Sequence, residues 1–164
     1  MLFSLHNINK LSPYKFIEVD DDTLCLFTDN SSEYLISFIK DESLGLDNVY
    51  QFCITQKTKG DVEIGPDKKI ALSIVALLKS FFADQNNILL FVCDNSDKHE
   101  AARNRKFTSW FNKYADHSLM EMKSESIDGD GCAFYVSIIY CKTIEDAKNI
   151  SDVFHSAFET LRSK

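Results

Sequence analysis

Three charged residues near the end of an apolar segment are the residues of this chain best suited to chemistry. Asp94 directly follows the apolar run Ile88–Cys93, Asp97 comes three residues later, and Arg103 lies in the next predicted helix. A carboxylate in such a place can act as a general base or a metal ligand, and a guanidinium can hold a phosphate or carboxylate. The same residue types are common in turns and in surface ion pairs, so a purely structural role is the competing interpretation.

The elements on either side of these residues are predicted to be a buried strand and an amphipathic helix. Ile88–Cys93 contains no polar residue, as expected for a central strand that is covered on both faces. Asp97 and Glu100 have the spacing of a capping box, which predicts the start of a helix. Ligands bind beyond the carboxyl ends of strands, and anions bind at helix N-termini, so this turn is the expected place for a site. The apolar stripe of the helix consists of Phe107, Trp110, Phe111 and Tyr114.

The composition is typical of a globular protein, and we expect a single domain over residues 1–164. The chain has 45% apolar residues, 13 Phe, 5 Gly and 2 Pro, and its net charge of −7 gives a pI near 5.0. That charge opposes binding to nucleic acid or to an anionic membrane. Acidic residues are concentrated in residues 18–47, which contain nine of them and a single basic residue, Lys40.

The cysteines and the N-terminus predict a cytoplasmic protein. The five cysteines are scattered in apolar segments and form no pair or Cys/His cluster with the spacing of a metal site, so they resemble small buried residues in a reducing compartment. The N-terminus lacks the charged and apolar regions of a signal peptide, and no apolar run approaches the length of a transmembrane helix.

The N-terminal half predicts an antiparallel meander of four strands. Polar turn residues separate short strands predicted over residues 14–19, 23–28 and 33–39, and the alternating segment 49–56 predicts a fourth, half-buried strand. Residues 1–12 have no clear period, and we expect a short strand or a loose cover there.

Three helices are predicted in the rest of the chain. Asp67 can cap the first, the second follows the central strand, and Thr143 with Asp146 resembles a capping box that opens the third. A short strand near Leu119–Lys123 and a long strand at Cys132–Cys141 separate the last two helices. The predicted order is ββββαβαββα, an α+β fold with about three helices packed on a mainly antiparallel sheet.

Two acidic turns suggest metal binding, but turn chemistry explains them better. The side chains of Asp20, Asp21 and Asp22 should diverge at a hairpin tip, where Asp is favoured in any case. The segment 128–131, Asp-Gly-Asp-Gly, lacks the remaining oxygen ligands of a calcium loop. We therefore expect neither a metal nor a cofactor.

Three segments of the chain are distinctive: Tyr14–Phe27, Val49–Phe52 and, most specifically, the segment VCDNSDKHEAARNRKFTSWF that ends at Phe111. Through these segments the chain resembles DUF6169, a family of unknown function, over roughly residues 12–115. The resemblance implies a bacterial cytoplasmic protein and no particular reaction. The motif residues that match are Asp94, Asp97, Arg103, Phe107, Trp110 and Phe111.

Two hypotheses about function follow. The first is a non-enzymatic interaction or regulatory module that binds a protein partner, because no catalytic motif is recognisable and the charge is unevenly distributed. The second is a small hydrolase or phosphate-ligand binder that uses Asp94, Asp97 and Arg103, with His99 and Arg105 as further contributors.

Overall fold

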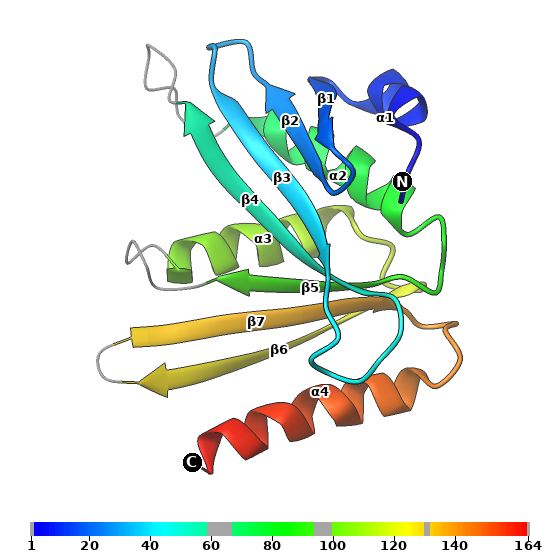
Figure 1. Cartoon of the computed structure of the whole chain (residues 1–164), viewed down its shortest axis with the longest axis vertical. Coiled ribbons are helices and arrows are strands. Elements are labelled where there is room, and N and C mark those ends of the chain that lie inside the picture. The colour runs from blue at the N-terminus through cyan, green and yellow to red at the C-terminus, as the bar shows by residue number, and fades with distance from the viewer. Residues whose placement is uncertain (1, 59–66, 94–99, 130–131, 164) are drawn as a thin grey trace. The chain divides into compact units, whose positions relative to one another are not determined.

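The structure, a computed structural model, describes residues 2–58, 67–93, 100–129 and 132–163. Its elements follow in the order αββββαβαββα (Figure 1), which confirms the predicted α+β class and adds a helix at the N-terminus. The helices are α1 (Leu5–Leu11), α2 (Lys68–Phe81), α3 (Glu100–Tyr114) and α4 (Ala147–Arg162). The strands are β1 (Lys15–Asp20), β2 (Thr23–Phe27), β3 (Glu33–Lys40), β4 (Val49–Thr58), β5 (Ile88–Cys93), β6 (Met120–Gly129) and β7 (Cys132–Cys141).

The strands are hydrogen-bonded in the order β1-β2-β3-β4-β5-β7-β6, so the predicted N-terminal meander of four strands is confirmed. The pairs β1/β2, β2/β3, β5/β7 and β6/β7 are antiparallel.

The chain divides into two compact units, the first of residues 1–39 and 52–84 and the second of residues 40–51 and 85–164. Among the described residues, no helix combines the length and the apolarity that crossing a membrane requires.

The first unit has an aromatic core centred on Phe38 of β3. The Phe38 ring lies 5.0 Å from that of Phe81, 5.2 Å from that of Phe3 and 5.4 Å from that of Phe52, measured between ring centroids. The predicted cap of α2 is confirmed, because the Asp67 carboxylate accepts a hydrogen bond of 2.8 Å from the Lys69 N–H.

The N-terminal helix α1 differs from the expected strand or loose cover. It is held by the Ser4 hydroxyl at its N-cap, which accepts from the Asn7 N–H, and by the burial of Ile8 at 1% exposure. A helix of seven residues is too short to show a clear hydrophobic period, and its stability depends on packing against α2.

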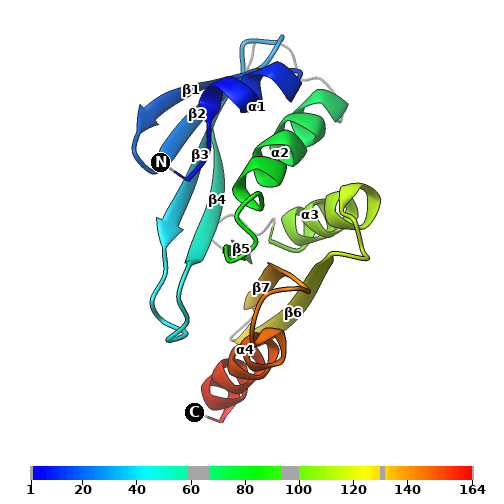
Figure 2. The same ribbon diagram turned by 90° about the vertical axis from the view of Figure 1, so that its right-hand side faces the viewer.

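In the second unit, α3 and α4 cover opposite faces of the strands β5, β7 and β6 (Figure 2). On the α3 face, Phe107 stacks on Phe91 of β5 with ring centroids 3.9 Å apart. On the α4 face, buried residues of the strands and of α4 form one core cluster. Its members are Val49, Ile88, Leu90, Ile138, Tyr140, Ile150, Phe154 and Phe158.

Two local predictions for the second unit need correction. Strand β6 is ten residues long and extends to Gly129, because β7 pairs with it along its whole length, whereas the sequence predicts only a short strand. The capping box predicted for Thr143 and Asp146 is not formed. Asp146 itself is the N-cap of α4 without a side-chain cap bond, and the Thr143 hydroxyl donates to the side-chain oxygen of Gln85.

Candidate functional site

The residues that the sequence marks for chemistry lie mostly beyond what the structure describes. Asp94, Asp97 and His99 are outside the described residues, and Arg103 is described only by its main chain in α3. Arg105 is described and is exposed. The proposed site at this turn therefore stays a prediction of the sequence.

Strand β6 lies at an edge of the sheet, with β7 as its one neighbour among the described strands. The Lys142 N–H donates a hydrogen bond of 2.7 Å to the carbonyl oxygen of Leu119, so the main chain of Leu119 faces β7. Successive residues of an antiparallel strand alternate the side to which their main-chain groups point. Met122, Ser124 and Ser126 consequently direct their N–H and carbonyl groups away from β7.

One outward group of β6 confirms this alternation. The carbonyl oxygen of Ser126 accepts a hydrogen bond of 2.7 Å from the guanidinium of Arg162, which comes from the last turn of α4. Among the described residues, the main-chain groups of Met122 and Ser124 that point outward have no such partner. An edge with free hydrogen-bonding groups is a template for another strand.

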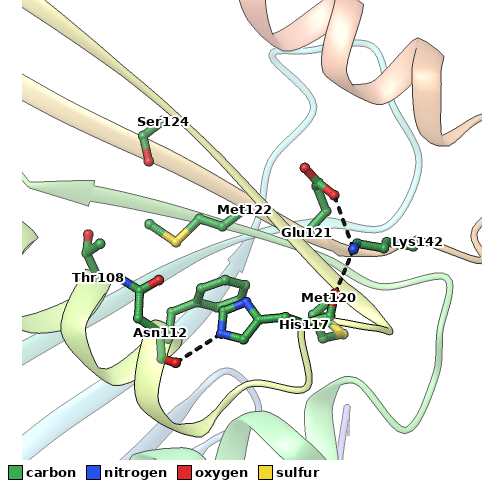
Figure 3. Close-up of a pocket in the computed structure, with 9 residues that line it drawn as sticks. Thr108, Asn112, His117, Met120, Glu121, Met122, Ser124 and Lys142 are labelled. Carbon is green, nitrogen blue, oxygen red and sulfur yellow. Dashed lines mark hydrogen bonds and ion pairs between the residues drawn. The ribbon is translucent and has the colours of Figure 1, made fainter.

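A pocket of about 470 Å³ lies beside this edge, between α3 and β6 (Figure 3). The side chains at alternate positions of β6 share the α3 face, because Ser124 pairs with Ser137, which in turn pairs with Phe91 under α3. The lining residues are Thr108, Phe111, Asn112, His117, Met120, Glu121, Met122, Ser124 and Lys142. The pocket therefore combines thioether and aromatic surface with hydroxyl, amide and charged groups.

Internal hydrogen bonds fix the pocket wall near the start of β6. The His117 ring donates from Nε2 to the carbonyl oxygen of Asn112 at 2.9 Å, since a carbonyl can only accept, and its ring meets that of Phe111 edge-on at 5.3 Å. The ammonium of Lys142 donates to the carbonyl oxygen of His117 at 2.6 Å and lies 3.9 Å from a carboxylate oxygen of Glu121 (Figure 3). These bonds hold the turn before β6 against the strand.

The loop residue Asp116 supports the same turn. Its carboxylate accepts hydrogen bonds from the hydroxyl and from the N–H of Ser118, at 2.5 and 3.0 Å. These bonds favour the ionised form and hold the pKa of Asp116 below its ordinary value. The turn is thus fixed by its own polar contacts.

A charged cluster occupies the opposite, α4 face of the same strand. Glu125 of β6 contacts Nδ1 of His155 and accepts a hydrogen bond of 2.5 Å from Arg162, and its side chain is only 17% exposed. The hydrogen bond from Arg162, followed by that from His155, holds the pKa of Glu125 below its ordinary value. The sequence gives no sign of this cluster, because 30 or more residues separate Glu125 from its partners and no local signal relates them.

Several polar groups of this region are already engaged within the chain. The Ser124 hydroxyl is hydrogen-bonded to the Ser137 hydroxyl at 2.8 Å, and the His117 ring nitrogen is engaged with the main chain. Within the described part of the chain, no three or more His, Cys, Asp or Glu side chains gather closely enough to hold a metal ion. Beside the pocket, β6 presents the outward main-chain donors and acceptors of Met122 and Ser124.

Comparison with known proteins identifies a family. The model of DUF6169, described as a family of unknown function, matches residues 66–156. This span includes the segment that ends at Phe111, on which the sequence resemblance chiefly depends, and leaves out Tyr14–Phe27 and Val49–Phe52. No curated protein and no solved structure has a significant match to the chain.

Proposed function

We propose that this chain, which belongs to the DUF6169 family, is a non-enzymatic interaction module that binds an extended protein segment along the free edge of β6. The observation that carries the proposal is the position of Met122 and Ser124. Their main-chain groups point outward from the edge, and their side chains line the adjacent pocket. In recognition by strand addition, main-chain hydrogen bonds supply affinity and pockets for alternate side chains supply specificity.

The pocket suits an apolar or amphipathic side chain of the bound segment. Met120 and Met122 are half-buried, and methionine side chains adapt their shape to different partners. The aromatic ring of Phe111 offers a flat apolar surface, and Thr108 and Asn112 offer hydrogen bonds at the rim. A segment paired with β6 would direct every second side chain toward this pocket.

The proposed partner is a protein of the bacterial cytoplasm. The net charge of −7 disfavours nucleic acid and anionic membranes. Cys25 and Cys141 are buried free thiols, as is usual in a reducing compartment.

The test is a selection of random nonapeptides displayed on phage against the wild-type protein, followed by fluorescence-polarisation titration of the selected peptides. Ser124→Pro removes one outward N–H and leaves the main-chain bonds to β7 in place, although the side-chain bond to Ser137 is lost. Met122→Lys places a charge at the edge. We expect both changes to weaken binding at least about tenfold, the equivalent of roughly 1.4 kcal/mol. The matched control is Leu11→Lys, at a position in α1 that is 74% exposed, and should leave binding unchanged. Peptides that bind Ser124→Pro and wild type equally would overturn the proposal.

The alternative hypothesis, a small hydrolase or phosphate-ligand binder with Asp94, Asp97 and Arg103, can be separated by a thermal-shift screen. Nucleotides, sugar phosphates and divalent metals are tested on wild type and on Asp97→Asn. A ligand that binds the native state raises the melting temperature with concentration. A ligand-dependent rise that Asp97→Asn abolishes would favour this alternative.

A further inference from the structure

We infer that the segment bound at the free edge of β6 is β6 of a second copy of this chain, paired antiparallel about a two-fold axis at Ser124. This inference rests on the proposed strand addition and names its partner. Antiparallel pairing of one strand with its own copy gives an isologous two-fold interface, the commonest symmetry of soluble oligomers. The sequence of β6 determines whether such pairing is favourable, because each residue of β6 lies opposite a residue of the same strand in the second copy.

The proposed register pairs nearly the whole of β6. With Ser124 opposite Ser124 of the second copy, Met122 lies opposite Ser126 and Met120 lies opposite Asp128. Met122, Ser124 and Ser126 are the residues whose main-chain groups point outward, so the register aligns outward donors with outward acceptors. Of these acceptors, the Ser126 carbonyl also receives the bond from Arg162. The strand extends from Met120 to Gly129, and the axis at Ser124 lies close to its middle.

Charge complementarity supports this register on the α4 face. Lys123 lies opposite Glu125 of the second copy, and by symmetry Glu125 lies opposite the second Lys123. Opposite charges directly across an antiparallel pair are favourable. The side chain of Lys123 is 37% exposed, and its ammonium lies 3.1 Å from a carboxylate oxygen of Glu121 in the same strand.

The neighbouring registers are less favourable. An axis at Lys123 would place Lys123 opposite its own copy and Glu121 opposite Glu125, which brings like charges together. An axis at Met122 would pair Glu121 with Lys123, but it would use only the first half of β6, because the strand begins at Met120. Only the axis at Ser124 combines complementary charges with pairing along nearly the full strand.

The charges on β6 therefore disfavour pairing with an unrelated strand and favour pairing with a second copy of β6. Glu121, Lys123 and Glu125 alternate in sign along one face, and such charges normally protect an edge strand from casual pairing. Against a copy of the same strand in the proposed register, the pattern becomes complementary. Arg162 and His155, which contact Glu125, extend the row of charges from each copy of α4.

The first experiment is disulfide cross-linking in the full-length protein. Directly opposite residues of a hydrogen-bonded antiparallel pair have Cα atoms about 5.5 Å apart, a separation that a disulfide can bridge. Ser124→Cys is expected to give a covalent dimer after treatment with diamide, seen on a non-reducing gel. The matched control is Ser126→Cys, which lies opposite Met122 and would be more than about 13 Å from its own copy along the strand. Wild type reports any contribution from the native cysteines.

The second experiment measures self-association by sedimentation equilibrium over a range of protein concentrations. Lys123→Glu places a carboxylate opposite Glu125 twice in each dimer and should raise the dimer dissociation constant at least about tenfold. Lys10→Glu makes the same change of net charge in α1 and should leave the dissociation constant within about twofold of wild type. Circular dichroism of each variant confirms that it is folded.

The outcomes separate this inference from the function on which it rests. A dimer that Lys123→Glu weakens and Ser124→Cys traps supports the second copy as the partner. A wild-type protein that stays monomeric, or a dimer that Ser126→Cys traps in preference to Ser124→Cys, overturns the inference. Strand addition itself fails only if peptide binding is also insensitive to Ser124→Pro, a separate measurement.

Discussion

Arg162 donates a hydrogen bond of 2.7 Å to the main-chain carbonyl oxygen of Ser126, which points outward from the free edge of β6. The same guanidinium donates to the carboxylate of Glu125 at 2.5 Å. The last turn of α4 thus occupies one of the groups that an added strand requires. A side chain that occupies a main-chain group at the edge of a sheet limits the pairing of another strand with that edge.

Replacing Arg162 should open the edge. In Arg162→Ala the Ser126 carbonyl has no competing donor, so we expect binding of a strand to β6 to become roughly two- to tenfold tighter, the range that one net hydrogen bond provides. Because Arg162 is 44% exposed, the free energy of unfolding should fall by less than about 1 kcal/mol. Sedimentation equilibrium and urea denaturation measure the two effects. Weaker association in Arg162→Ala would show that the guanidinium helps the added strand.

Glu125 should make stability depend on pH in the acid range. Its pKa is held below the ordinary value of 4.5 by Arg162 and then by His155, so the carboxylate stabilises the fold above that value and loses its effect as the pH falls through the lowered pKa. We expect Glu125→Gln to be less stable than wild type by about 0.5–1 kcal/mol at neutral pH. This difference should vanish in strong acid, as measured by urea denaturation at a series of pH values.

A control for this pH dependence is Glu159→Gln, which changes the same charge at an exposed residue of α4. Its free energy of unfolding should stay within about 0.5 kcal/mol of wild type throughout. A stability difference between Glu125→Gln and wild type that does not change with pH would contradict the proposed role of the carboxylate.

Tyr14 should make stability depend on pH in the alkaline range. Burial, followed by the 2.5 Å hydrogen bond from its hydroxyl to the Asp67 carboxylate, raises the pKa of Tyr14 from 10.0 to about 12. The protonated phenol therefore stabilises the fold below pH 10, and this contribution is lost as the pH rises to about 12. We expect Tyr14→Phe to cost about 2 kcal/mol at neutral pH, with a smaller cost above pH 10.

Urea denaturation at neutral and alkaline pH, with absorbance titration of the phenolates, checks the effect of Tyr14. Tyr114→Phe removes a hydroxyl from a half-buried ring of α3 and is the matched control, expected to change stability by less than about 0.5 kcal/mol. If Tyr14→Phe and Tyr114→Phe were equally stable at neutral pH, the bond to Asp67 would have no net effect on folding.

Phe107 should be the residue that attaches α3 to the sheet. It is 4% exposed and stacks on Phe91, so Phe107→Ala should lower the free energy of unfolding by about 3–5 kcal/mol. Phe134→Ala, at a position that is 40% exposed on β7, is expected to cost less than about 1.5 kcal/mol. Equal losses for the two variants in urea denaturation would mean that the stacked pair contributes little to the attachment of α3.

Much of the fold followed from local patterns. Asp67 and the apolar period after it predicted α2, and the uninterrupted apolar run Ile88–Cys93 predicted a buried strand, since both patterns express contacts within a few residues. The helix α1 was missed because seven residues show no period, and β6 was predicted too short because its polar sequence becomes a strand only through pairing with β7.

The sequence by itself determined the class of the fold, the order of most elements and the family, because these depend on residue type and spacing along the chain. The tertiary structure alone decided that β7 lies between β5 and β6, which leaves β6 at an edge. It also decided that Arg162 and His155 meet Glu125 across more than 25 residues, and that Met122 and Ser124 line a pocket under α3. Contacts between distant segments depend on strand order and helix placement, which no local pattern encodes.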